Sequence, residues 1–228
     1  MKTRNFLVSL TLLAVPGYLS ATIVYNNGSF NSVDADEISA YQVGEDFNLA
    51  SAATVNEITF WSLEQTTNIA CGGACSGYSG SISWAIETDN SGVPSGTILD
   101  SGTASGAGVT RVNTGSTYLG GTVFSDTFNI TSFPALAGIN YWLVLHNGAT
   151  LNTPTTFDGF YWATSNGGSP DPYTGQSMFL TGVNAWQDTG NEHAFELLNV
   201  AASTPEPGTI ALLGAGLVGL AAMRRRRS

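Results

Sequence analysis

Two cysteines, Cys71 and Cys75, lie close together and enclose Gly72-Gly73-Ala74. Such a pair could form a disulfide, hold a metal or exchange electrons. A metal site would need further ligands, and the only imidazoles belong to His146 and His193. Redox motifs usually place two residues between their cysteines, whereas this pair has three. The glycines let a small ring close, and we therefore expect a structural disulfide if the chain reaches an oxidising compartment, which favours such a bond.

The two histidines could also act as general bases. Neither lies in a Gly-x-Ser-x-Gly or His-Glu-x-x-His context. His146 ends an apolar run that reads as a strand, and His193 begins another. We expect both to be strand-edge histidines that bond to the backbone.

Three carboxylates, Asp34, Asp36 and Glu37, cluster after Phe30. Hard cations such as Ca²⁺ bind several oxygen ligands on loops of this kind, although no glycine turn follows here. A solvated acidic loop is the alternative that the sequence favours. Paired carboxylates could also hydrolyse glycosides, but no pair stands out among the many acidic residues. No other cofactor is indicated.

Three successive aromatic residues, Phe160, Tyr161 and Trp162, form the most suggestive run for binding a ligand. In a strand they cannot all face one side. An exposed plate of Tyr161 and Trp162 beside Asp158 would suit stacking on a sugar ring. Packing in a core is the alternative, and it is the usual fate of aromatic residues in a β-sandwich.

The elements that must position these residues are strands. Apolar and polar residues alternate with a period of two, and turn signals such as Asn27-Gly28 and Asn147-Gly148 separate the runs. The run from Tyr141 to His146 is apolar on both faces, which is typical of a central strand. We expect an all-β fold, an antiparallel β-sandwich of jelly-roll type. The expected strands lie at 22–26, 41–49, 55–63, 80–88, 97–104, 107–112, 122–131, 139–147, 158–164, 177–182 and 193–200.

The start of the chain has the form of a secretory signal helix. Lys2 and Arg4 precede an uncharged run from Phe6 to Val15, and Ser20-Ala21 offers small residues for cleavage. The run is well short of the roughly 20 apolar residues that a membrane-spanning helix needs. Residues 1–21 are therefore expected to be a cleaved signal peptide.

The end of the chain has three parts in order. Pro205, Glu206 and Pro207 make a stiff stretch, and an uncharged run from Thr209 to Met223 follows. This run reads as a short transmembrane helix. A basic cluster then holds the C-terminus on the cytoplasmic side of the inner membrane, because basic residues remain inside. The cluster is made of Arg224, Arg225, Arg226 and Arg227.

These three parts resemble the PEP-CTERM sorting domain of Gram-negative bacteria. The resemblance covers residues 204–228 and leaves residues 22–203 as the β-sandwich domain. It implies recognition by an exosortase near Pro205-Glu206-Pro207, in an organism that makes exopolysaccharide. It also implies a protein that crosses the inner membrane and reaches the cell surface or is secreted.

The composition of residues 22–203 limits what the domain can bind. Arg111 is its one basic residue and sixteen residues are acidic, so its formal charge is −15. Nucleic acid is excluded as a partner, because such binding needs basic residues against phosphates. We expect a non-enzymatic structural or adhesive component of an exopolysaccharide matrix or biofilm, with a secreted glycan hydrolase as the alternative. A third alternative, a purely structural surface protein, would need neither a glycan-binding site nor a catalytic site.

Overall fold

The computed structural model describes residues 21–152, 156–167, 173–179 and 185–201, and Ala21–Val200 form one compact unit. The expected signal helix, the expected transmembrane helix and the Pro-Glu-Pro motif lie outside the described residues. Within the described part of the chain, no helix has the length and hydropathy that crossing a membrane requires.

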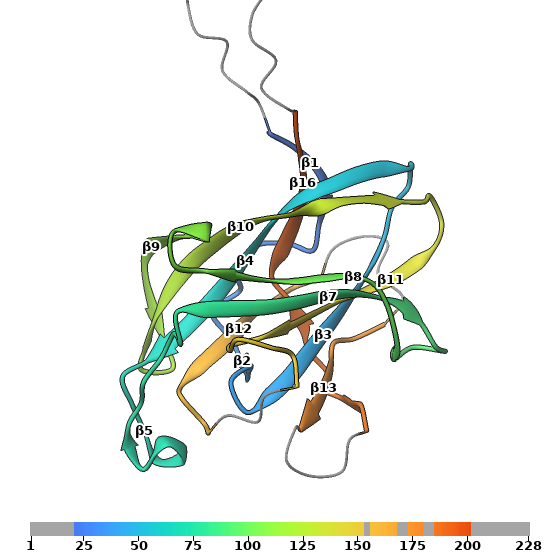
Figure 1. Cartoon of the computed structure of the whole chain (residues 1–228). Helices are drawn as coiled ribbons and strands as arrows, with labels where there is room; N and C mark the ends of the chain where they lie inside the picture. Colours follow the sequence, from blue (N-terminus) through green and yellow to red (C-terminus); the bar gives the residue numbers. More distant parts are fainter. Residues whose placement is uncertain (1–20, 153–155, 168–172, 180–184, 202–228) are drawn as a thin grey trace, which may run out of the picture. The chain divides into compact units, whose positions relative to one another are not determined.

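One sheet of the domain is built around five strands that are paired in the order β1-β16-β4-β10-β9 (Figure 1). Three further strands belong to this sheet: β12 pairs with β4, and β2 and β15 pair with β12. The bounds are β1 Ala21–Asn26, β2 Ala35–Glu37, β4 Ala53–Gln65, β9 Val109–Tyr118, β10 Gly121–Ala135, β12 Phe160–Ser165, β15 Glu192–His193 and β16 Phe195–Val200.

The second sheet has six strands in the order β14-β13-β3-β11-β7-β8. Their bounds are β3 Tyr41–Asn48, β7 Ser81–Asp89, β8 Pro94–Ser105, β11 Asn140–His146, β13 Gln176–Phe179 and β14 Gln187–Asp188. A separate hairpin of β5 (Thr67–Asn68) and β6 (Gly73–Ala74) encloses the short 3₁₀ helix η1, Ile69–Cys71. A second 3₁₀ helix, η2, spans Gly106–Gly108.

The named strands pair antiparallel throughout, and the pairs are nested. β7 pairs with β8 at the centre of the nest, then β4 pairs with β10, β3 with β11, and β1 with β16. This is the pairing of a hairpin that has been rolled up, as in a jelly roll. The expected antiparallel all-β architecture is confirmed.

The hydrophobic core lies between the two sheets and takes residues from both. Ile82, Trp84 and Ile86 of β7 lie in this core, as their alternation predicted. β11 lies between β3 and β7, and its Tyr141, Leu143 and Leu145 point into the same core. Its other face is also buried, since Trp142 and Val144 belong to a second cluster. The expectation of a central strand that is apolar on both faces is therefore confirmed.

Candidate functional site

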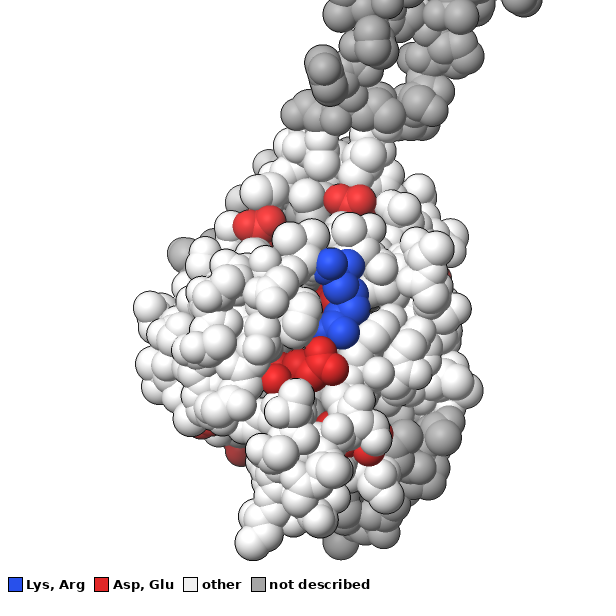
Figure 2. Space-filling model, turned by 90° about the vertical axis from the view of Figure 1, so that its left-hand side faces the viewer, with Lys and Arg blue, Asp and Glu red and all other residues white. Residues whose placement is uncertain are grey.

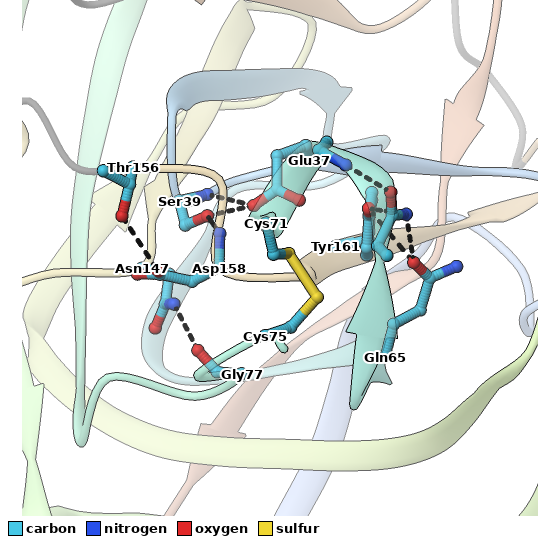
Figure 3. Close-up of a disulfide and its surroundings, with 12 residues drawn as sticks. Glu37, Ser39, Gln65, Cys71, Cys75, Gly77, Asn147, Thr156, Asp158 and Tyr161 are labelled. Carbon is cyan, nitrogen blue, oxygen red and sulfur yellow. Dashed lines mark hydrogen bonds between the residues drawn. A yellow bond between two sulfur atoms is a disulfide. The ribbon is translucent and has the colours of Figure 1, made fainter. Parts of the chain in front are cut away.

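The structure joins Cys71 to Cys75 by a disulfide, with their Cα atoms 5.2 Å apart. The bond closes the tip of the β5–β6 hairpin (Figure 3). Asn68 caps η1, because its side-chain oxygen accepts the Ala70 N–H at 2.9 Å. Gly72 follows η1 in the left-handed conformation, with φ +72°, which favours glycine. Local chemistry thus fixes the shape of the hairpin.

The hairpin is held on β12 through a close approach at Gly159. A Cβ atom at this glycine would lie 2.8 Å from Cys75 Sγ and 2.9 Å from the Gln65 carbonyl oxygen. Its φ of +74° also excludes most other residues. The Gln65 N–H donates to the Gly159 carbonyl at 2.9 Å, which fixes the base of the hairpin to the same point.

Tyr161 is the one member of the aromatic run that faces away from the core. Its half-buried phenol accepts a hydrogen bond from Asn68 Nδ2 at 3.1 Å and donates to Gln65 Oε1 at 3.3 Å. Burial, and then the nearby carboxylate of Glu37, raise the pKa of Tyr161 to about 12. The side chain is therefore a neutral aromatic ring bordered by two amides beside the disulfide hairpin.

Trp162 is buried in the core, which was the favoured alternative, so it does not form an exposed plate with Tyr161. The indole is fully enclosed, it packs against Phe60 and Phe195, and its Nε1–H donates to the Ala194 carbonyl at 2.9 Å. The physical reason is strand alternation, which turns neighbouring side chains to opposite faces of β12. Tyr161 remains as the candidate contact for a sugar ring.

Asp158 precedes β12 and lies near the hairpin (Figure 3). Its Oδ1 accepts the Thr156 hydroxyl at 3.1 Å, and its N–H donates to Ser39 Oγ at 2.9 Å. Its carbonyl accepts the Gly77 N–H at 2.7 Å. These bonds tie the start of β12 to two other loops.

The acidic residues Asp34, Asp36 and Glu37 point to different partners. Asp34 Oδ1 accepts the Ala35 N–H at 2.9 Å, whereas Asp36 Oδ2 lies 2.8 Å from an imidazole nitrogen of His193. Glu37 Oε1 accepts the backbone N–H of Ser39 at 3.1 Å and its hydroxyl as well. Burial raises the pKa of Glu37, and the Ser39 bonds oppose this shift.

The geometry therefore does not support a calcium site of these three carboxylates, which was the less favoured of the two interpretations. Among the described residues, no group of three or more His, Cys, Asp or Glu side chains is placed to hold a metal ion. The segment is also not a plain loop, because Ala35–Glu37 form β2 and pair with β12. As residues of one strand, Asp36 and Glu37 point to opposite faces.

His193 lies between two carboxylates from different sheets. Its Nδ1 is 2.5 Å from Glu45 Oε2 on β3, and its Nε2 is 2.8 Å from Asp36 Oδ2 on β2. Both His193 and Glu45 are fully buried. Burial alone would lower the pKa of His193, but the hydrogen bonds and charges of Asp36 and Glu45 raise it to about 9. The imidazolium is thus an ionic link between the sheets.

This arrangement corrects one of the two histidine expectations. His146 bonds to the backbone as expected, with its Nε2 2.9 Å from the Ser39 carbonyl oxygen. His193 instead bonds to two carboxylates. The sequence carries one signal of this, because Glu45 lies in the same alternation phase as Val43 and Phe47, which are core residues. An acidic residue in an apolar phase needs a buried partner.

Arg111 is the only lysine or arginine among the described residues, and the one blue patch in Figure 2 lies between red, acidic patches at the surface. Its Nε–H donates to Asp126 Oδ1 at 2.6 Å and its Nη2 to Glu64 Oε2 at 3.1 Å. The guanidinium also lies 4.4 Å from the ring centre of Tyr78 and 4.3 Å from that of Phe124. These contacts occupy the cation and leave it little freedom to bind a ligand.

Comparison with known proteins identifies the end of the chain. Residues 203–227 match the PEP-CTERM protein-sorting motif, and no curated protein matches the chain. The matched stretch includes Pro205-Glu206-Pro207 and Arg224–Arg227, and it lies outside the described residues. This chain therefore carries a PEP-CTERM sorting motif. The motif marks a substrate of exosortase that is exported across the inner membrane of a Gram-negative bacterium to the cell surface, or is secreted.

Proposed function

We propose that this exosortase-sorted protein is a non-enzymatic structural or adhesive component of a cell surface or extracellular matrix, in contact with exopolysaccharide. The observation that carries the proposal is the pairing of Thr22 with Asn199 across β1 and β16, which remains after removal of residues 1–21. Both ends of the folded domain therefore leave from the same place, and the sorting motif begins at residue 203. Such a domain is displayed as one unit, with the loops at its other end available for contact.

The contact with polysaccharide is proposed to involve Tyr161. The formal charge of −15 excludes simple attraction to an acidic polymer, so contact must come from stacking, hydrogen bonds or a bridging cation. Tyr161 offers part of an aromatic face, and Gln65 and Asn68 place amide groups beside its hydroxyl. A ring bordered by amides suits a neutral sugar.

The experiment measures the affinity of the purified domain for a neutral and an acidic bacterial exopolysaccharide by affinity electrophoresis. We expect Tyr161→Ala to weaken binding about tenfold, which corresponds to about 1.4 kcal/mol. Tyr161→Phe should retain most of the affinity, because it keeps the ring. Tyr173→Ala, which removes a partly exposed tyrosine that packs against Trp142 of the second sheet, is the matched control.

Chelation and product analysis complete the test. Binding should survive a chelator, because Asp34, Asp36 and Glu37 point to different partners. Loss of binding in chelator would show that a cation forms the contact. The absence of binding to either polymer, with or without calcium, would refute the polysaccharide contact and leave a purely structural role. The release of new reducing ends would favour the alternative, a secreted glycan hydrolase.

A further inference from the structure

Three apolar side chains are exposed on neighbouring loops beside the disulfide hairpin. Ile69 of η1 is 96% exposed, Val33 is 69% exposed and Leu119 is 53% exposed. We call these three residues the apolar tip. Burying an aliphatic side chain is favourable. An isoleucine that is held in water on a covalently closed hairpin therefore adds no burial free energy to the stability of the isolated domain. Exposed apolar side chains on adjoining loops offer a surface on which another molecule can dock.

Hydrogen bonds hold the three loops of the apolar tip together. Gln65 Nε2, at the base of the hairpin, donates to the Leu119 carbonyl at 2.7 Å. The Tyr118 hydroxyl donates to the Asp34 carbonyl at 3.0 Å, which ties the turn after β9 to the loop that carries Val33. The backbones of the three loops are therefore fixed relative to one another, which lowers the entropic cost of binding.

The hairpin is uncharged in a domain that is otherwise strongly acidic. Residues 65–86 contain no charged side chain, and Glu64 just before them is paired with Arg111 at 3.1 Å. Asp34, next to Val33, is the carboxylate that borders the tip. Two copies of the domain repel each other through most of their surfaces. Contact between the hairpins of two copies brings together their least charged segments, where the electrostatic repulsion is weakest.

The apolar tip also lies at the end of the domain away from its chain ends. β4 runs from Ala53 to Gln65, and Gln65 lies at the base of the hairpin. The opposite end of β4, at Ala53, pairs with Ala135 at the end of β10. In Figure 1 the hairpin around β5 is at the bottom, whereas the ends of β1 and β16 are at the top. Domains that are held by their tails would therefore present their tips to one another.

We infer that the apolar tip docks on the apolar tip of a second copy of this chain. The contact is isologous, with the same patch on both copies related by a two-fold axis. Three side chains per copy make a small interface, so a single contact is weak. Many such contacts between two coated surfaces give a high avidity, because the first contact raises the effective concentration of the neighbouring pairs of domains. The inference thus gives the domain a self-adhesive role between surfaces.

The experiment couples the domain to beads through a C-terminal tag and counts bead aggregates in the absence of any polysaccharide. We expect wild-type beads to aggregate and Ile69→Ser beads to aggregate at least about tenfold less, because avidity amplifies a small loss per contact. Ile69→Leu should restore aggregation. The matched control is Leu136→Ser, since Leu136 is 59% exposed in the turn after β10, at the other end of the domain.

Salt and chelator separate this contact from others. Aggregation should increase between about 0.01 M and about 0.15 M ionic strength, because the Debye length falls from about 30 Å to about 8 Å and the acidic surfaces repel less. Aggregation that a chelator abolishes would instead indicate a cation bridge and overturn the proposal. So would wild-type beads that stay dispersed, or an Ile69→Ser variant that aggregates as the wild type does. Because no polysaccharide is present, these results are independent of the Tyr161 test.

Discussion

Arg111 stabilises the domain by balancing a buried carboxylate. The side chain of Asp126 is fully buried, burial raises its pKa, and the charge of Arg111 opposes that shift. Breaking a buried ion pair costs about 3–5 kcal/mol, and because Arg111 is partly exposed we expect Arg111→Met to cost the lower value. The measurement is urea unfolding at neutral pH. Adding Asp126→Asn to this variant should recover part of the loss, since it removes the unpaired charge, and no recovery would contradict this account.

His193 predicts a stability that decreases at alkaline pH. Its folded pKa of about 9 lies above the ordinary 6.5, so the stability it contributes is fully present below pH 6.5 and is lost as pH rises through 9. Burial raises the pKa of Glu45 to about 7, and this shift has the same sign. The pKa of Asp36 is lowered, because its bonds to His193 outweigh its burial, so that contribution is lost only in acid.

The measurement for this second prediction is the urea midpoint across the pH range. We expect the midpoint to fall between about pH 6 and about pH 10 in the wild type. The Glu45→Gln variant should show a smaller fall, because it removes one carboxylate that holds the His193 proton. An equal fall in both proteins would show that other groups cause it.

The sequence indicated these two clusters only in part. Asp126 lies in the same alternation phase as the apolar residues Phe124 and Phe128. The structure explains this buried acidic residue by its ion pair with Arg111. The pairing itself could not be predicted, because partners far apart in sequence meet only after the sheets have formed. His193 is 148 residues from Glu45 and 157 from Asp36, and no local pattern encodes such a distance.

At the scale of elements, the disulfide hairpin is expected to add little to global stability. A ring of five residues restricts the unfolded chain by about 2 kcal/mol at most in the chain-entropy view. We expect the Cys71→Ser/Cys75→Ser variant to lose no more than this in urea unfolding. Exported wild-type protein should not react with a thiol reagent until a reductant is added. Labelling of both cysteines without reductant would contradict the disulfide.

Strands were predicted well where side chains alternate over many residues. Each of the eleven expected segments overlaps a strand in the structure, and the apolar faces of β11 placed it correctly at the centre of its sheet. β2 was missed because its three residues, Ala35–Glu37, include two acids and read as a loop. It exists because β12 offers an edge for pairing, which is tertiary information.

For the whole molecule, the sorting motif predicts a shorter mature protein. We expect residues 1–21 and the segment from about Pro207 onward to be absent from protein isolated from its native host. The reason is removal of the signal peptide and exosortase processing near Pro205-Glu206-Pro207. Intact-mass analysis checks both sites and any attached group. Native protein that still carries Arg224–Arg227 would contradict the processing.

The attachment of the tail to β16 has a mechanical consequence. β16 lies between β1 and β4 and is antiparallel to both, and the chain runs from its last residue, Val200, toward the sorting motif. A pull on the tail draws β16 lengthwise past two neighbours. The hydrogen bonds on both sides then bear the load together, in shear, instead of opening one after another as in peeling an edge strand. A domain held by this tail would therefore resist a pull along the strand.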